Sequence, residues 1–306
     1  MSKKVIITGA TGLIGRELVN ALHQRGDEIT VFTRNTSKAK SLFPQSIKLV
    51  EWDYNKPEIW QSSLEDANAI IHLAGTNLFA KRWNKKFKED ILNSREISTR
   101  NLVTAIKSCK NKPEVFISAS AIGFYGNRGD ENLTESSSAG NDFLANVCKV
   151  WESEAEKVKD LGLRNVRVRT GIVLSPEDGA LKQMLLPFKL FIGGPLGNGN
   201  QWMSWLHIDD MIQIYLYALD NKEISSAINA VAPNPLRMKE FAKTLGKILK
   251  RPSIFPVPKF ILRLVVGDAA SVVTASQKVS ADKLLKAGYK FKFTKLSDAL
   301  QNLLSK

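Results

Sequence analysis

The chain has 306 residues, of which 43% are hydrophobic and 24% charged, and this ordinary globular usage excludes disordered and fibrous proteins. Its 44 Lys and Arg residues exceed its 30 Asp and Glu residues, which gives a net charge of +14. Because the cations are spread along the chain and no nucleic-acid-binding motif accompanies them, we expect a solvated basic surface and no specific nucleic-acid partner.

Short β-rich runs alternate with helical periodicity through the first half of the chain. We predict strands over 5–7, 29–32, 47–50, 69–73 and 115–118, and a further strand that begins at 166. Helical patterns fill the intervals, among them 91–108. This order predicts an α/β fold with a doubly wound parallel (Rossmann) sheet and right-handed crossovers.

The pattern changes after Ser175. A glycine-rich loop occupies 193–200, prolines then interrupt short mixed elements, and an amphipathic helix is predicted over 296–304. We therefore predict a sheet domain over 1–175 and a smaller C-terminal α/β lobe over 176–306, with some return of the chain to the sheet. The lobe should cover the ligand-binding edge of the sheet.

The first strand leads directly into a glycine-rich turn, Gly9-Ala10-Thr11-Gly12-Leu13-Ile14-Gly15. One glycine permits the tight turn, one lets backbone approach a pyrophosphate, and one lets helix and strand pack closely. The helix that follows offers free N–H groups and a positive dipole end to phosphates. The contacts predicted in this turn are Thr8, Gly9, Thr11, Gly12, Leu13, Ile14 and Gly15.

The residues that follow the second predicted strand indicate whether NAD or NADP binds. NAD is favoured by an acidic residue there, whereas this chain has Arg34, whose guanidinium suits a 2′-phosphate. We therefore predict NADP(H), with a solvated basic loop as the alternative role for this segment. The predicted strand-end contacts are Thr33, Arg34, Asp53, Leu73, Ala74 and Gly75.

With these residues in view, the chain resembles the extended, epimerase-like branch of the short-chain dehydrogenase/reductase superfamily. The resemblance rests on the glycine turn, His72-Leu73-Ala74-Gly75, the segment Ser-Ala-Ser-Ala-Ile-Gly-Phe-Tyr-Gly at 118–126, and Leu-His-Ile-Asp-Asp at 206–210. More narrowly, it resembles atypical epimerase family proteins of unknown function, sometimes named nucleoside-diphosphate-sugar epimerases or cell-division inhibitors. The narrower match includes Arg82-Trp83, Asn93-Ser94-Arg95, Trp151-Glu152 and Ser276-Gln277-Lys278-Val279.

The resemblance covers essentially the whole chain and implies a small-molecule substrate held between the sheet edge and the C-terminal lobe. Relatives often form dimers through helices beside the sheet, so the resemblance is also compatible with a homodimer. Two cysteines fit a reducing, cytoplasmic setting, and three scattered histidines give no reason to expect a metal. No apolar run of about 18 residues is present, so we expect no membrane partner.

Working members of the superfamily use a Ser, a Tyr and a Lys, usually with an upstream Asn. Ser120 fits the Ser position, with Ser118 as the alternative, and Arg95 stands at the Asn position. The Tyr-x-x-x-Lys helix should fall in 143–151, pairing either Leu144 with Cys148 or Ala145 with Lys149, and neither register supplies a tyrosine.

The resemblance thus leaves two functions to compare. The first is an NADP(H)-dependent oxidoreductase of atypical chemistry, with Ser120, Arg95, Cys148 and Tyr125 as its candidate catalytic residues. Its substrate is a nucleotide sugar or another small carbonyl or alcohol by analogy. The alternative is a non-catalytic NADP-bound redox sensor or interaction scaffold, which the missing Tyr and Lys would favour.

Overall fold

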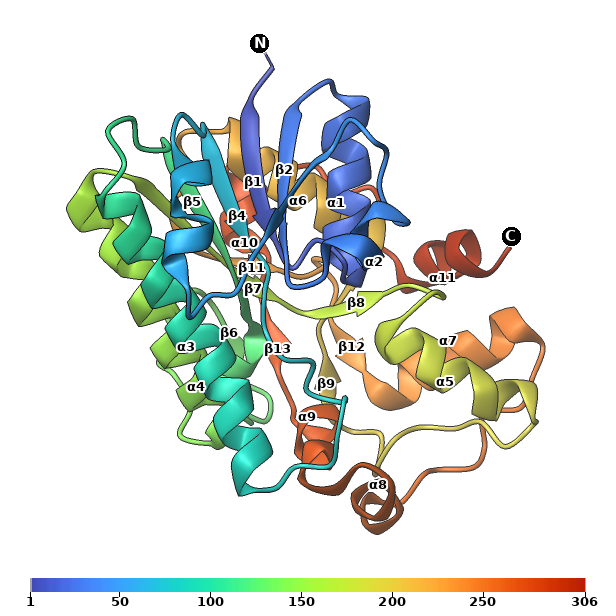
Figure 1. The fold of residues 1–306 in the computed structure, drawn as a ribbon. Helices are drawn as coiled ribbons and strands as arrows, with labels where there is room; N and C mark the ends of the chain where they lie inside the picture. Colours follow the sequence, from blue (N-terminus) through green and yellow to red (C-terminus); the bar gives the residue numbers. More distant parts are fainter. Residues whose placement is uncertain (1, 306) are drawn as a thin grey trace.

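A seven-stranded parallel sheet forms the centre of the computed structural model, which describes residues 2–305 apart from the side chain of Val265 (Figure 1). In spatial order its strands are β11 (Ser226–Ala230), β7 (Arg164–Thr170), β5 (Val115–Ala121), β4 (Ala69–His72), β1 (Lys4–Thr8), β2 (Glu28–Thr33) and β3 (Lys48–Glu51). The order reverses direction beside β1, where ligands bind in doubly wound sheets.

Most strands of the sheet are buried on both faces because their alternate side chains enter two separate cores, whereas the edge strand β3 has no buried residue. Val5 and Ile7 of β1 enter one core, whereas Ile6 between them enters the other. Such strands are continuously apolar rather than alternating, which is why short runs such as Val-Ile-Ile were recognisable.

Helices form a layer on each face of the sheet. The first layer contains α1 (Leu13–Gln24) and α6 (Ile208–Asp220), and the second contains α3 (Lys85–Lys107) and α4 (Phe143–Glu156). Short elements connect the strands: α2 (Thr36–Lys40), η1 (Pro57–Ile59), η2 (Gln61–Leu64), η3 (Ile122–Tyr125) and η4 (Lys157–Leu161).

The later part of the chain adds small strand pairs and helices beside the sheet's carboxyl edge (Figure 1). The pairs are β8 (Ile172–Leu174) with β10 (Trp205–His207), β9 (Trp202–Met203) with β12 (Leu236–Arg237), and β6 (Asn132–Leu133) with β13 (Lys278–Val279). The helices are α5 (Gly179–Lys189), α7 (Met238–Leu249), α8 (Lys259–Val266), η5 (Gly267–Ala269), α9 (Ala270–Thr274), α10 (Asp282–Lys286) and α11 (Leu296–Leu304). The predicted division into domains at 175/176 stays a prediction, since β11 and α6 follow residue 176 but belong to the central sheet and its helix layer.

The predicted α/β fold with its parallel sheet is confirmed, with differences at element ends. The helix predicted over 91–108 begins at Lys85, because the side chain of Asn84 accepts the Phe87 N–H and caps it. The first turn of α3 therefore contains three lysines, Lys85, Lys86 and Lys88. No helix within residues 2–305 is both long and apolar enough to cross a bilayer.

Candidate functional site

The three glycines of the first turn have different surroundings. A Cβ on Gly9, whose φ is +70°, would lie 2.7 Å from the backbone of Leu73, and one on Gly15 would lie 2.5 Å from Ala10 Cα. A Cβ on Gly12 would meet nothing nearer than 3.4 Å. Gly9 and Gly15 are thus required by packing, whereas Gly12 leaves open space in front of the helix.

That open space faces the N-terminus of α1. Within residues 2–305 no side chain caps this helix, and its first turn holds no acidic residue, so its leading N–H groups keep their hydrogen-bonding capacity. Thr11 and Gly12 are exposed, and Leu13 and Ile14 are half-buried. The turn therefore fits a pyrophosphate, with backbone N–H groups as donors and Gly12 giving room.

A buried hydrogen-bond chain fixes the ends of β1 and β4 against each other. Thr8 Oγ1 lies 2.7 Å from His72 Nδ1 and accepts the Ala74 N–H at 3.3 Å, while His72 Nε2 lies 3.0 Å from Thr99 Oγ1. Because Thr99 donates its own proton to a carbonyl one turn earlier in α3, His72 must donate from Nε2 and accept at Nδ1. Thr8 and His72 thus hold the strand ends, and Thr8 is fully buried.

The imidazole of His72 stays neutral in this setting. Burial first, and the nearby Arg95 guanidinium second, lower the pKa of His72 from 6.5 to about 3. Leu73 and Ala74 are half-buried and Gly75 is exposed, so the strand end beyond the histidine is accessible beside the glycine turn.

The predicted selector of the dinucleotide lies at the end of β2. Arg34 is exposed, and within residues 2–305 it makes no hydrogen bond or ion pair. Thr33 is buried and accepts the Asn35 N–H at 3.3 Å. Asp53, just past β3, accepts the Asn55 N–H with Oδ1 at 3.0 Å and keeps its second oxygen unengaged.

Arg95 approaches the same edge from α3. Its guanidinium donates to the carbonyls of Ile91 and Thr76, at 3.0 and 3.2 Å, and lies 5.1 Å from the centre of the Trp151 ring. A Cβ on Gly75 would come within 2.9 Å of Arg95 Cζ, so this glycine gives the arginine its place. Desolvation lowers the pKa of Arg95, although the group remains a cation at neutral pH.

Ser120 belongs to a buried ionic network. Its hydroxyl donates to Glu152 Oε1 at 2.7 Å, and Arg169 binds the same carboxylate through two N–H groups at 2.8 and 2.9 Å. Ser120, Glu152 and Arg169 are each no more than 4% exposed. Because the Ser120 hydroxyl uses its only proton in the hydrogen bond to Glu152, its oxygen lone pairs remain available as acceptors. Ser118, in contrast, donates only to the neighbouring Ala119 carbonyl.

The orientation of α4 shows which of the two predicted residue pairs, Leu144 with Cys148 or Ala145 with Lys149, faces the site. Leu144 and Cys148 both face Gly123: a Cβ there would lie 3.6 Å from Leu144 Cβ and 3.9 Å from Cys148 Sγ. Lys149 is exposed and points elsewhere. The geometry therefore places Leu144 and Cys148, the first of the two predicted pairs, beside the η3 segment that follows Ser120.

Cys148 keeps its proton in this setting. Burial and the Glu152 carboxylate raise the pKa of its thiol to about 12, despite the opposing effect of Arg95. Sγ lies 3.8 Å from the Ala121 carbonyl oxygen. The residue is a protonated thiol beside Arg95 and Ser120, and not a thiolate nucleophile.

Tyr125 is placed differently from the other three candidates. Its side chain is fully buried, and its hydroxyl donates to Asn229 at 2.6 Å and accepts from Arg169 at 3.0 Å. Burial raises the pKa of Tyr125, against the opposing charge and hydrogen bond of Arg169. Its hydroxyl is joined to Ser120 only through Arg169 and Glu152, so the structure brings Ser120, Arg95 and Cys148 together without it.

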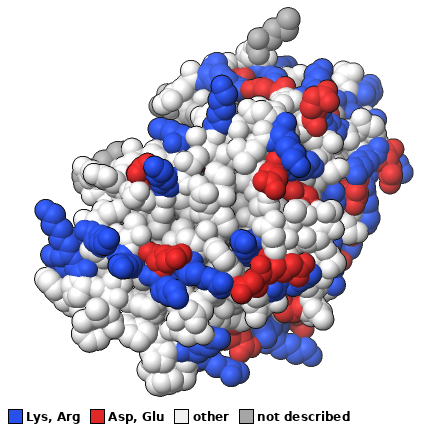
Figure 2. Space-filling model, turned by 180° about the vertical axis from the view of Figure 1, so that it is seen from behind, with Lys and Arg blue, Asp and Glu red and all other residues white. Residues whose placement is uncertain are grey.

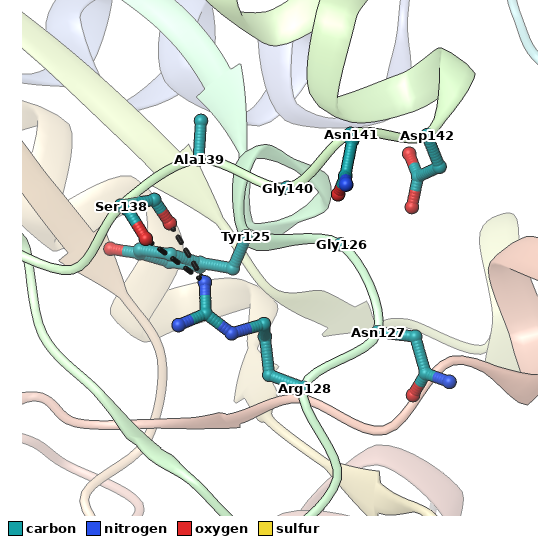
Figure 3. A pocket seen from close by; sticks show the side chains of 9 residues that line it. All are labelled: Tyr125, Gly126, Asn127, Arg128, Ser138, Ala139, Gly140, Asn141 and Asp142. Atoms are coloured by element: carbon teal, nitrogen blue, oxygen red, sulfur yellow. Dashed lines mark hydrogen bonds between the residues drawn. The ribbon is translucent and has the colours of Figure 1, made fainter.

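A polar cavity of about 450 Å³ lies beyond η3, next to the end of β5 (Figure 3). Its lining comes from two loops, 125–128 and 138–142, and Figure 3 shows Arg128 reaching across to Ser138. Asn141 lies beside Asp142, which caps α4 through the Ala145 N–H. The cavity offers amide, guanidinium and hydroxyl groups to a polar substrate.

Comparison with known proteins supports the family resemblance. Residues 5–230 match the model of the NAD dependent epimerase/dehydratase family, which is more than half of the chain. The chain belongs to this family. Residues 257–303 match a further family model, described as a domain of unknown function (DUF1731).

Members of the family with similar sequences occur in plants and bacteria. The chain is 38% identical to the chloroplastic homologue of epimerase family protein SDR39U1 from Arabidopsis thaliana, over 98% of this chain and 86% of that protein. It is 34% identical to epimerase family protein YfhF of Bacillus subtilis, over 98% of both chains. A crystal structure of human SDR39U1 (isoform 2) with NADPH superimposes with a TM-score of 0.89, at 31% identity and 99% coverage of each chain. The resemblance to epimerase family proteins is confirmed.

Glu152 and Arg169 were not identified as site residues by the sequence analysis. Glu152 was visible only as part of a matching segment, and Arg169 only as part of a strand. Glu152 follows Cys148 by four positions and so shares its face of α4, a signal that helical spacing supplies. The partnership of Glu152 with Arg169 depends on how α4 packs against β7, which no local pattern encodes.

Proposed function

We propose that this protein is an NADP(H)-dependent oxidoreductase that transfers a hydride at an alcohol or carbonyl carbon of a small polar substrate. The observation that carries the proposal is the open cradle at Gly12, in front of an uncapped helix and one strand away from an exposed, unpaired Arg34. NADPH bound to the human relative supports the same choice of cofactor.

Two phosphate-bearing parts of the cofactor would meet donor groups of the protein. The N–H groups of the Gly9–Gly15 turn would hold the pyrophosphate, and Arg34 would pair with the 2′-phosphate of the adenosine ribose. The strand end at 73–75 would lie along the cofactor because it is accessible beside the glycine turn. When bound, the nicotinamide supplies or accepts the hydride.

Ser120 takes the place of the missing tyrosine in the proton transfer. Its oxygen accepts a hydrogen bond from a substrate hydroxyl, and as that hydroxyl loses its proton to Ser120, the proton of Ser120 passes to Glu152. The two N–H groups of Arg169 hold the carboxylate in position for this exchange. In the direction of carbonyl reduction the protons move the opposite way.

The remaining groups orient the substrate. Arg95 presents a cation at the end of β4, which suits a carbonyl oxygen or an anionic substituent. Cys148 contributes a protonated, weakly donating thiol on the same side. The polar cavity at 125–128 and 138–142 would hold the part of the substrate remote from the reacting carbon, and a nucleotide sugar fits it by analogy only.

A non-catalytic function as an NADP-bound sensor or scaffold is the second candidate. It is favoured by Leu144, an apolar side chain at the position of the usual proton donor. Such a protein would keep the cofactor cradle and change its protein partners with cofactor occupancy.

The two candidates are separated by single-turnover measurements on NADP(H)-loaded protein with a panel of nucleotide sugars and small carbonyls, following nicotinamide absorbance. An oxidoreductase loses about 100-fold or more in rate on Ser120→Ala, with cofactor affinity retained. Ser118→Ala on the same strand is the matched control and should keep its rate. No turnover with any substrate, together with a partner exchanged on cofactor binding, would support the sensor instead.

A further inference from the structure

Large apolar side chains gather on one margin of the C-terminal lobe. Nine of them are between 36% and 71% exposed: Leu186, Leu190, Phe191, Ile192, Ile254, Phe255, Phe260, Ile261 and Leu264. We call this set the apolar margin. Folded monomers seldom leave large contiguous apolar areas exposed unless the area binds something.

The two chain segments that form the margin run side by side. Phe255 donates its N–H to the Gly193 carbonyl at 3.2 Å, and Val257 donates to Pro195 at 2.9 Å. The guanidinium of Arg251 lies 4.3 Å from the centre of the Phe191 ring. Figure 1 shows these segments along the lower right edge, between the end of α5 and α8.

The helix α8 is the most exposed part of the margin. Apart from Val265, whose side chain is not described, none of its side chains is buried, although the helix is mostly apolar. Phe260 and Leu264 are four positions apart and about 70% exposed, so they form one outward stripe. Lys259 and Arg263 form a neighbouring stripe of charge.

The two segments that form the margin carry charge of one sign. Segments 179–197 and 247–266 contain no Asp or Glu. Their cations are Lys182, Lys189, Lys247, Lys250, Arg251, Lys259 and Arg263. In the turned view of Figure 2, an uncharged area lies at the lower left, the side on which Figure 1 places α5 and α8, with a row of mostly blue side chains interrupted by red above it and further blue side chains below it. Among residues 2–305, the acidic contact from outside the two segments is Asp268, which lies 3.9 Å from Arg263 and also pairs with Lys88.

The sign of the charge decides what can cover the margin. A second copy related by a two-fold axis would bring the same cations face to face, with no acidic residue in either segment to neutralise them. The occupant of the margin must accept both its cations and its apolar side chains. A partner with an anionic surface over an apolar interior does so, because Lys and Arg contact the negative charge while the apolar side chains leave water. We propose that the apolar margin docks on the surface of an anionic lipid bilayer.

Docking of this kind requires no spanning segment. The nine apolar side chains of the margin would enter the boundary between headgroups and acyl chains, and the cations would remain at headgroup level. The sequence expectation of no membrane partner rested on the lack of a spanning run, which bears on crossing a bilayer and not on lying against one. The proposal does not depend on the reaction proposed above.

The test is co-sedimentation of the full-length protein with vesicles. One set is phosphatidylcholine alone, and the other adds about 30% phosphatidylglycerol, a content that gives a clear negative surface potential. Wild type should bind the anionic vesicles and not the neutral ones. The double variant Phe260→Glu with Leu264→Glu should bind at least tenfold more weakly, and Lys259→Ala about fivefold more weakly. Ile59→Glu, at a 47% exposed apolar site on η1 outside the margin, should bind like wild type.

Three outcomes would overturn the proposal. One is absence of binding to anionic vesicles by wild type, and another is equal binding by wild type and the double variant. The third is a wild-type dimer, measured by light scattering after gel filtration, that the double variant converts to monomer, since the margin would then be a self-interface. NADPH affinity is measured for every variant, and an unchanged value shows that the fold is retained.

Discussion

The hydroxyl of Ser120 donates a hydrogen bond of 2.7 Å to Glu152, and the carboxylate that receives it is held at the same time by Arg169. A buried carboxylate is otherwise costly, and here its charge is balanced by a guanidinium in direct contact. The pair links a strand-end serine to a helix residue 32 positions later. In the proposed reaction, this pair would supply a proton route that needs no tyrosine.

Loss of the Glu152 charge should destabilise the fold. Glu152→Gln leaves Arg169 buried without its anion, so the free energy of unfolding should fall by about 3–5 kcal/mol in urea titrations. Glu156→Gln, at the end of α4, removes a half-exposed charge that pairs with Arg167 and Lys159, and as the control it should cost less than about 1 kcal/mol. Equal losses for the two variants would show that the buried pair contributes no special stability.

The thiol of Cys148 should resist alkylation. Its pKa is raised to about 12 and its side chain is buried, so the reactive thiolate is scarce and shielded. Cys109 is also buried, and burial likewise raises the pKa of its thiol. Iodoacetamide at about pH 8, below both thiol pKa values, should modify neither cysteine of the native protein and both after denaturation. Rapid labelling of native Cys148, located by peptide mass spectrometry, would contradict this description.

His72 should make stability depend on acid. Its pKa falls from 6.5 in the unfolded chain to about 3 in the folded one, so between these values the unfolded state binds a proton that the folded state does not. Stability is therefore fully present above about pH 6.5 and declines by about 1.4 kcal/mol per pH unit as the pH falls toward 3. His72→Gln cannot bind that proton, so wild type should lose stability more steeply than the variant in this window. Parallel slopes in denaturant titrations at several pH values would rule out a buried neutral imidazole.

Arg34 should determine which dinucleotide binds. Replacing Arg34 by Ser removes a charged hydrogen bond to the 2′-phosphate, so NADPH affinity should fall roughly 10- to 100-fold while NADH affinity changes little. Lys38→Ser, a neighbouring exposed cation, serves as the control in the same calorimetric titrations. If Arg34→Ser weakens both cofactors equally, the arginine does not read the 2′-phosphate.

Much of the fold was predictable because its signals are local. The buried parallel strands are short apolar runs, and the turn Gly9–Gly15 is a contiguous motif placed between a strand and a helix. The start of α3 was missed because residues 85–90 are almost all charged, and the Asn84 cap that begins the helix is a single weak signal.

The site was predictable only in its contiguous parts. Ser120, Arg95 and Cys148 were found through the resemblance, and the structure brings them together. The pairing of Glu152 with Arg169, and the proton arrangement around His72, depend on contacts between distant segments. The apolar margin was hidden for a related reason, since segments such as 259–266 have the composition of buried helices and only packing shows that they are exposed.

The central claim is that the space at Gly12 receives the pyrophosphate of NADPH, and it is tested by titrating cofactor-free wild type and Gly12→Ala with NADPH while following thermal unfolding. Without cofactor, the two proteins should differ by less than about 1 kcal/mol, because the added methyl meets only ordinary contacts. NADPH at about 100 times its dissociation constant should stabilise wild type by about 2.7 kcal/mol. The same concentration should leave Gly12→Ala almost unchanged. No stabilisation of wild type, or equal stabilisation of both proteins, would contradict the account.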